Sequence, residues 1–500
     1  MNILQYSESA NEEKRKLAHI CDTVKRVTRL NGALYVSILV IYLSMFLNNV
    51  LLSSVVPVLP DMLNTIENSE DNIRQSNTSA TKHYMDLVYK SMKKMLPPET
   101  EKAAVLLSSK SVIQLAINPL VAMLISKIGY YVSLLIGNII LLATSFAFAF
   151  GNSFIVLILC RGLHGIASIM ITISGMCICA KIFYQDENSR SKYMGIILSS
   201  EALGILVGYS FGAFTYNLLG KSTPFVVTGL AILTNIVLLI LYQGSIAKAQ
   251  FDSNCYLAIG DSKWCSICGL LEDGFILTIL GAVFISSSTV AVLEPCLPYW
   301  LIENIELKDW QTGLMFLPDS FGYLLSTSTC GILAYKVGRW KMTIVSLIIV
   351  GCCSIMIPNA TSLVQLSLPH FGIGLGIGAT DCALIPLLAR YVDLQRNIHY
   401  GSVYALQQVI TSTAYVCGAL LGGGFVDIIG FSSVMRIIGF SNVVYAIAFL
   451  FYGNKHALLA ENMELCETSV SYEPIGEPMK LISIKVNRNY HSVGNSEDSD

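Results

Sequence analysis

The segments LISKIGYYVS (residues 124–133) and ILAYKVGRWKM (residues 332–342) are weak copies of one another. Each follows a long apolar run and places a lysine two residues before a glycine, Gly129 in the first copy and Gly338 in the second. Glycine adopts backbone angles that other residues resist, and tight turns between helices need such angles. Because the two copies lie in different halves of the chain, they indicate an internal duplication.

Long apolar runs occupy most of the chain on either side of these turns. Of the 500 residues, 53% are hydrophobic and 13% are charged, whereas a soluble globular protein carries about 25% charged residues. A helix needs about 20 mostly apolar residues to cross a bilayer. We expect twelve such helices, at residues 34–58, 103–126, 131–150, 154–184, 193–216, 223–243, 274–298, 312–334, 342–358, 364–389, 401–424 and 431–452.

The predicted helices fall into two equal sets. A polar stretch at residues 244–272, a predicted cytosolic linker, separates a first half (34–243) from a second half (273–452). The predicted fold is therefore an all-α membrane protein with two six-helix halves. Parallel halves of this kind place a substrate site at their interface, near the middle of the membrane.

Lysine and arginine residues predict the orientation in the membrane, because they are enriched in cytosolic loops. They gather in the N-terminal segment, residues 1–33, and in the short connections on the same side. This segment and the tail at 453–500 are therefore predicted to be cytosolic. The long 61–102 loop then faces the lumen, where its sequon at Asn77 is a predicted glycosylation site.

Several ionisable side chains lie within the predicted spans, where charged groups are costly and face the bundle interior or a watery cavity. We single out Lys110, Arg161, Glu201, Glu294 and Asp381. Polar residues also recur at helical spacing, Gln114 and Asn118 on the second span and Gln408 and Tyr415 on the eleventh. Such stripes predict a water-accessible pathway. The alternative, that polar side chains only link neighbouring helices, stays open for Gln114 and Asn118.

A carboxylate that alternates between a buried and a charged environment takes up a proton in one and releases it in the other. Competition between a proton and an organic cation for Glu294 or Asp381 would therefore couple their movement in opposite directions. The sequence holds no nucleotide-binding loop, metal cluster or nucleophile–base pair. We expect no enzymatic activity, no cofactor, no metal and no nucleic-acid partner.

Several segments closely resemble the vesicular monoamine and acetylcholine transporter family. They are NNVLLSSVVPVLP (48–60), SKSVIQLAINP (109–119), CRGLHGIAS (160–168), LEPCLPYW (293–300), WQTGLMFLP (310–318), GILAYKVGRW (331–340), DCALIPLLARYVDL (381–394) and YGSVYAL (400–406). The resemblance covers nearly all of residues 30–452. It implies the major facilitator fold in a secretory- or synaptic-vesicle membrane, where the proton gradient of the acidic lumen drives uptake of a cationic transmitter. Expected partners are a small organic amine, protons and membrane lipid, with a monomeric carrier and sorting adaptors on the cytosolic tail.

The resemblance also implies roles for individual residues. Glu294 contacts the amine, and Asp381 is a protonatable group needed for transport. Tyr323 and Tyr415 line the pathway, and Phe316 is a gate aromatic. Further positions that match family pathway residues are Asn49, Lys110, Gln114, Asn118 and Arg161.

The chain departs from the family at several of these positions. The family carries aspartates where this chain has Asn48 and Gln408, so two carboxylates are replaced by neutral amides. An amide can hydrogen-bond but cannot bind a proton or carry the charge that attracts an ammonium group. Glu201, at a position that the family leaves apolar, is a candidate replacement for the missing negative charge. Tyr209 stands where the family motif expects a proline.

These departures leave three hypotheses for a divergent member of the family. The first is a proton-coupled vesicular carrier of an organic amine, because Glu294 and Asp381 are retained. The second keeps the fold but carries a less charged or zwitterionic solute, because Asn48 and Gln408 remove two negative charges. The third is a non-transporting relative that acts as a binding protein.

Overall fold

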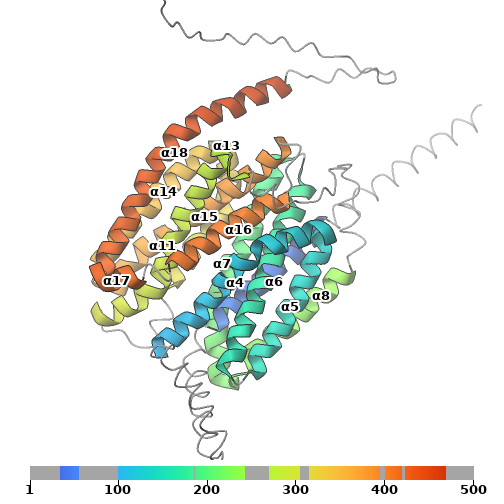
Figure 1. Cartoon of the computed structure of the whole chain (residues 1–500), viewed down its shortest axis with the longest axis vertical. Coiled ribbons are helices and arrows are strands. Elements are labelled where there is room, and N and C mark those ends of the chain that lie inside the picture. Colours follow the sequence, from blue (N-terminus) through green and yellow to red (C-terminus); the bar gives the residue numbers. More distant parts are fainter. Residues whose placement is uncertain are drawn as a thin grey trace, which may run out of the picture. The chain divides into compact units, whose positions relative to one another are not determined.

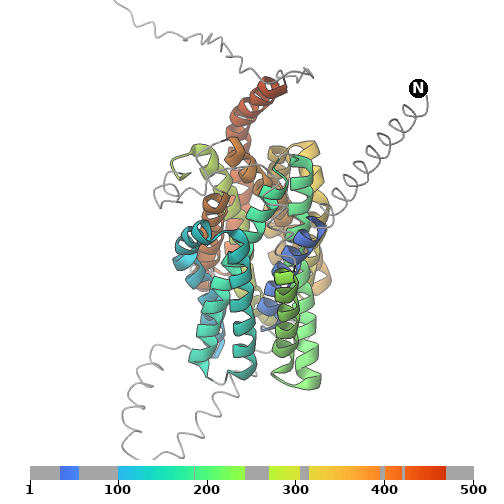
Figure 2. The same ribbon diagram turned by 90° about the vertical axis from the view of Figure 1, so that its right-hand side faces the viewer.

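A computed structural model shows the protein as a bundle of long helices (Figures 1 and 2). The structure describes residues 34–55, 99–151, 153–184, 186–241, 270–304, 315–394, 400–418 and 423–468. Within these ranges the regular structure is helical throughout. The described chain therefore has the all-α architecture that the sequence predicts.

Helices overlap all twelve predicted spans. The first half contains a helix over Leu34–Ser54, α4 (Glu99–Ile128), α5 (Tyr130–Phe150), α6 (Phe154–Ile182), α7 (Glu187–Leu219) and α8 (Thr223–Leu241). The second half contains α11 (Gly274–Asn304), α13 (Leu317–Val337), α14 (Arg339–Met356), η1 (Ile357–Asn359), α15 (Leu363–Leu394), α16 (Tyr400–Cys417), α17 (Gly423–Ile429) and α18 (Phe431–Thr468).

The two repeated turns have the geometry that their glycines predict. Gly129 joins α4 to α5 with φ of 87°, and Gly338 joins α13 to α14 with φ of 105°. Both angles lie in the left-handed region, where a side chain would clash with the backbone. The chain can therefore reverse direction without a longer loop at both positions.

Ten helices within the described ranges are long and apolar enough to cross a membrane. The helices at the other two predicted spans, α13 and α16, are more polar. α13 carries Asp319 and Tyr323, and α16 carries Gln408 and Tyr415. Polar residues on a membrane-spanning helix face other helices or water, so these two helices are the ones expected to border a pathway.

Helix α7 begins at Glu187, earlier than the predicted start at residue 193. Asp186 precedes the helix and accepts a hydrogen bond from the Ser189 N–H at 3.1 Å, the arrangement of an N-cap. The hydrogen bonds from Ser189 lower the pKa of the exposed Asp186 carboxyl. The early start brings Glu187 and Arg190 into the first turns of a helix rather than a loop.

Other boundaries also differ from the prediction. α13 begins at Leu317 rather than residue 312, α16 ends at Cys417 rather than 424, and α18 continues past residue 452 to Thr468. Residues Lys455–Asp500 form a second unit, of which the structure describes only the helical part. Most of the predicted terminal segments, the lumenal loop with Asn77 and the linker lie outside the described residues.

The two halves touch through α7 with α13 and through α4 with α16. The first of these contacts brings backbone against backbone. A Cβ atom at Gly195 of α7 would lie 2.7 Å from the Thr327 carbonyl oxygen, and one at Gly331 of α13 would lie 2.6 Å from the Ser191 carbonyl oxygen. Glycine at both positions is therefore what allows the halves to approach closely here.

Candidate functional site: a polar pathway between the two halves

Asn48 lies in the first helix and is buried. Its Nδ2 donates to Ser168 Oγ at 3.2 Å, and its Oδ1 lies 3.2 Å from His164 Nε2. His164 and Ser168 are one turn apart on α6. The amide that replaces the family aspartate is therefore bonded within the first half.

Asn49 and Arg161 also make their contacts within the first half. Asn49 donates to the Met45 carbonyl oxygen at 3.0 Å. Arg161 of α6 is 1% exposed, and its Nη1 lies 3.5 Å from the Leu52 carbonyl oxygen. Its Nε and Nη2 are buried with no hydrogen-bond partner. Arg161 is thus a buried cation that no carboxylate of the described residues contacts.

Lys110 of α4 lies among charged groups from several helices. It interacts electrostatically with Arg161 of α6, Glu201 of α7 and Glu294 of α11. None of the ion pairs within the described ranges includes Lys110. Glu201 therefore supplies negative charge near Lys110 without contacting it directly.

Asp381 of α15 accepts a hydrogen bond from the Tyr323 hydroxyl of α13, at 2.9 Å from Oδ2. Glu201 acts electrostatically on Asp381. Because Glu201 belongs to the first half and Asp381 to the second, these two carboxylates interact electrostatically across the interface. Two nearby carboxylates resist double ionisation, so such a pair favours holding a proton.

Glu294 is exposed, although Leu293 beside it on α11 is buried. It acts electrostatically on Lys110 of α4, Tyr209 of α7 and Tyr415 of α16. Helices of both halves therefore surround the carboxylate, and its exposure marks a solvent-accessible space inside the bundle. A carboxylate in such a space can meet either a proton or an organic cation.

Gln114 and Asn118 of α4 are buried between helices. Asn118 Nδ2 lies 3.5 Å from Ser412 Oγ of α16, which joins the two halves. Gln114 packs at Gly165 of α6, where a Cβ atom would lie 3.3 Å from Gln114 Cγ. These contacts favour the interpretation of the two residues as links between helices.

Phe316 stands at the start of α13 and stacks on Tyr209 of α7, with ring centroids 6.4 Å apart and planes at 15°. Phe316 also makes an edge-to-face contact with His370 of α15, with ring centroids 5.8 Å apart. Tyr415 and Gln408 are half-buried on α16. Phe316 therefore joins the halves, in keeping with the gate position that the resemblance implies.

Sequence reasoning missed three features of this region. Neither Asp319 nor His370 is singled out in the sequence analysis. Tyr209 was noted only as a departure from a proline motif. The signal was present in each case as a polar side chain in an apolar run, but its neighbours became visible only in the packed bundle.

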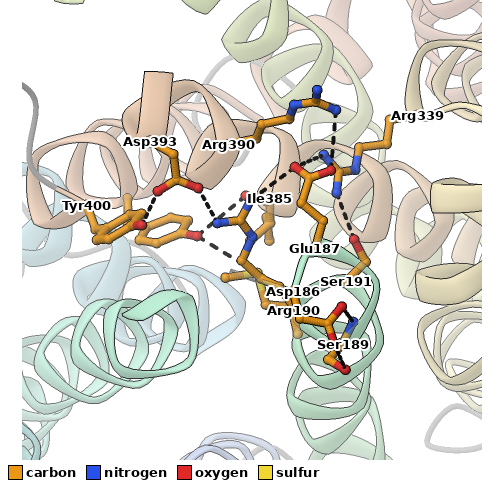
Figure 3. A network of polar contacts seen from close by, with 12 residues as sticks. Asp186, Glu187, Ser189, Arg190, Ser191, Arg339, Ile385, Arg390, Asp393 and Tyr400 are labelled. Carbon is orange, nitrogen blue, oxygen red and sulfur yellow. Dashed lines mark hydrogen bonds and ion pairs between the residues drawn. The ribbon is translucent and has the colours of Figure 1, made fainter. Parts of the chain in front are cut away.

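A network of ion pairs joins the halves at the end predicted to be cytosolic (Figure 3). Glu187 of α7 pairs with Arg190 at 3.1 Å, Arg390 at 3.3 Å and Arg339 at 3.6 Å. Arg190 also donates to Asp393 of α15, which accepts a second hydrogen bond from the hydroxyl of the first residue of α16. Arg190 is fully buried, so this network holds α7 against α14 and α15.

Comparison with known proteins agrees with this fold. The family model described as Major Facilitator Superfamily matches residues 34–255 and 278–465. The chromaffin granule amine transporter of Rattus norvegicus is 34% identical, with 80% of this chain and 75% of the relative covered. The synaptic vesicular amine transporter of Homo sapiens is 32% identical, with coverages of 81% and 86%. The vesicular acetylcholine transporter of Tetronarce californica is 30% identical, with coverages of 86% and 84%.

Solved structures match the fold at low sequence identity. The human organic anion transporter MFSD10 (TETRAN) has a TM-score of 0.66 at 16% identity, over 83% of this chain and 99% of that one. The proton:xylose symporter XylE has a TM-score of 0.63 at 12% identity, over 83% and 95%. At such identities the likeness concerns the fold alone.

The fold and the relatives together define a multi-pass membrane transporter, not an enzyme. The chain belongs to the Major Facilitator Superfamily and, within it, is a divergent member of the vesicular monoamine and acetylcholine transporter family.

Proposed function

We propose that the protein is a proton-coupled transporter that accumulates a cationic amine in acidic secretory or synaptic vesicles. The observation that supports this best is Glu294, a carboxylate exposed to a space that both halves border. An ammonium group can bind there without the desolvation cost of entering an apolar core. The vesicular amine transporters among the relatives indicate the same class of cargo.

Proton coupling rests on the acids that lie between the halves. Asp381 is hydrogen-bonded to Tyr323 and lies within electrostatic range of Glu201. Movement of one half against the other would separate Glu201 from Asp381 and change the charge around each. A proton taken up in one arrangement would be released in the other, in exchange for the amine.

Uptake into proteoliposomes with an imposed pH difference tests this proposal. Radiolabelled amines would be offered to the wild type and to Glu294→Gln and Asp381→Asn. We expect each substitution to lower gradient-driven uptake at least tenfold, because a neutral amide binds neither a proton nor an ammonium charge. Asp186→Asn is the matched control, since it makes the same chemical change at an exposed helix cap. Uptake that persists after the pH difference is collapsed would contradict proton coupling.

One observation favours a second candidate, a less charged or zwitterionic cargo. Asn48 is bonded to His164 and Ser168, while the Arg161 guanidinium leaves two nitrogens unpaired. Around Asn48 the described residues of the first half then offer the Arg161 cation and no carboxylate, which suits the carboxylate of a zwitterion. Restoring the family charges with Asn48→Asp and Gln408→Asp should raise amine uptake if this candidate is right. Absence of flux for every amine and amino acid offered would instead favour a non-transporting relative.

Three further predictions from the sequence are not tested by the described residues or by the relatives. Use of the sequon at Asn77, recruitment of sorting adaptors by the tail, and the monomeric state are therefore still predictions.

A further inference from the structure

His370 is a buried imidazole that the proposed pathway does not use. It lies on α15 and is 1% exposed. The Met315 backbone supplies one hydrogen bond, and Nδ1 is buried without a partner. A neutral imidazole has one donor and one acceptor nitrogen. The site therefore fits a neutral ring that donates to the Met315 carbonyl and whose acceptor nitrogen has no hydrogen-bond partner.

The His370 ring supports the aromatic contact between the halves. The His370 ring makes an edge-to-face contact with Phe316, and Phe316 stacks on Tyr209 of α7. Tyr209 lies 22 residues after Glu187, roughly 33 Å along α7 at about 1.5 Å per residue. The aromatic contact is thus far from the ion-pair network, toward the end of the bundle predicted to face the lumen.

A second unpaired polar group lies one helical turn from His370. Gly374 follows His370 by four residues on the same face of α15, and a Cβ atom there would lie 2.9 Å from Asp319 Oδ1. Asp319 Oδ1 is itself buried without a hydrogen-bond partner. No ion pair within the described ranges joins His370 to Asp319. An imidazole nitrogen without a hydrogen-bond partner therefore lies one turn of α15 from the Gly374 position, which borders a carboxylate oxygen that also has no partner.

Other titratable groups surround this pair. They come from every helix packed against this part of α15 and are Asp319 of α13, Tyr209 of α7, Glu294 of α11, Cys353 of α14 and Tyr415 of α16. Glu294 acts electrostatically on Asp319. Among these groups, Asp319 is the carboxylate nearest to the face of α15 that carries both Gly374 and His370.

We propose that His370 is a proton-binding residue that controls the Tyr209–Phe316 contact. The neutral ring packs against Phe316 and keeps the contact closed. A protonated ring has a second N–H that finds no acceptor in its present position, so it turns to the Asp319 carboxylate and withdraws its support from Phe316. Acid on the lumenal side then opens this end of the transporter. The inference takes from the proposed function only that the lumen is acidic. It does not depend on which cargo the protein carries.

Distance measurements between the two halves test the proposal without any substrate. Spin labels would be attached through ketone-bearing amino acids that replace Leu218 at the end of α7 and Val364 at the start of α15. Both side chains are exposed, at 64% and 83%, and ketone chemistry leaves the native cysteines unlabelled. The full chain would be placed in lipid nanodiscs, and distance distributions recorded between about pH 7.5 and about pH 5.5, the range over which histidine titrates.

We expect acid to raise the population with the longer distance at least threefold in the wild type. His370→Asn retains a donor for the Met315 carbonyl but cannot be protonated, so its distribution should not change with pH. His164→Asn is the matched control, because it replaces another buried imidazole, one that contacts Asn48 in the first half. It should retain the wild-type response.

Three outcomes would overturn the proposal. They are a wild type without an acid response, a His370→Asn variant that keeps the full response, and a loss of response in both histidine variants alike. Thermal unfolding of each variant shows whether it is folded. Because no cargo is used, none of these outcomes depends on whether the protein carries amines.

Discussion

The two ends of the interface between the halves are closed by different chemistry. At the end where α7 begins, Glu187 and the buried Arg190 form ion pairs with α14 and α15. At the other end, Tyr209 meets Phe316 ring on ring, with His370 behind it. Breaking a buried ion pair costs about 3–5 kcal/mol, whereas an aromatic pair contributes about 0.5–1.5 kcal/mol beyond its buried area. The aromatic end is therefore the one that opens more easily.

This difference suits a carrier that releases cargo into an acidic compartment. Ion pairs between arginine and carboxylate persist at mildly acidic pH, because arginine is always protonated and its charge favours the ionised form of the carboxylate beside it. A contact supported by histidine is more sensitive to acid than such an ion pair, because histidine is the side chain whose unperturbed pKa lies nearest to neutral pH. The proton-sensitive contact lies toward the lumenal end of the bundle, as the loop charges predict.

The largest effect is expected at the ion-pair end. Arg190→Gln should lower the free energy of unfolding by about 3 kcal/mol, because it leaves the Asp393 carboxylate without its buried partner. Thermal unfolding in detergent measures the loss. Arg390→Gln is the control, since Arg390 is 25% exposed and should cost at most about 1 kcal/mol. Equal losses in the two variants would mean that burial of the arginine does not determine how much these ion pairs contribute to the free energy of unfolding.

A smaller effect is expected from packing behind the aromatic end. Gly374→Ala would place a Cβ atom 1.9 Å from the Asp319 carbonyl oxygen, so α13 and α15 must move apart at a cost of about 1–3 kcal/mol. Gly401→Ala has no neighbour nearer than 3.8 Å and should be neutral or slightly stabilising. Unfolding curves that rank the two variants in the opposite order would contradict this account of the α13–α15 contact.

The aromatic contact itself can be weakened selectively. Tyr209→Leu removes the stacked ring and should lower the ratio of closed to open lumenal ends roughly threefold to tenfold, which corresponds to about 0.7–1.4 kcal/mol. Tyr209→Phe keeps the ring and should leave the ratio close to that of the wild type. The spin-label distances between α7 and α15 measure this ratio in both variants. A large opening in the phenylalanine variant would show that the hydroxyl, not the ring, holds the contact.

The smallest effect is expected at the exposed helix cap beside the ion-pair network. Asp186→Ala should cost about 1 kcal/mol at neutral pH, because it removes the acceptor for the Ser189 N–H. The pKa of Asp186 is lowered in the folded state. Its contribution is therefore complete above about pH 4, where the unfolded carboxyl is also ionised, and is lost as the pH falls through the lowered pKa. Unfolding curves recorded at neutral pH and below the lowered pKa of Asp186 measure this loss of stability.

Much of the fold follows from local signals in the chain. A run of about 20 apolar residues is long enough to cross a membrane wherever it occurs, so twelve spans could be predicted without any partner. Gly129 and Gly338 predict turns because the left-handed backbone conformation favours glycine. The start of α7 was harder, since its first turn is polar and is stabilised by Asp186 and by arginines from other helices.

The site was predicted as a set of residues rather than as a set of contacts. Lys110, Glu294 and Asp381 stand out because a charge within an apolar run is costly. Their neighbours do not stand out, because a side chain meets partners that are far away in the sequence. Asn48 illustrates this point, since its partners His164 and Ser168 lie on another helix.

Apolar length, loop charge and turn glycines are properties of neighbouring residues, and they were sufficient to predict the membrane class and the two halves. The resemblance of short segments was sufficient to predict the family. Pairing of Arg190 with Asp393, stacking of Tyr209 on Phe316 and burial of His370 against Met315 depend on how helices pack. Only packing removes water from such groups and decides which of them meet, because hydrogen bonds, ion pairs and ring contacts act over a few ångströms in space.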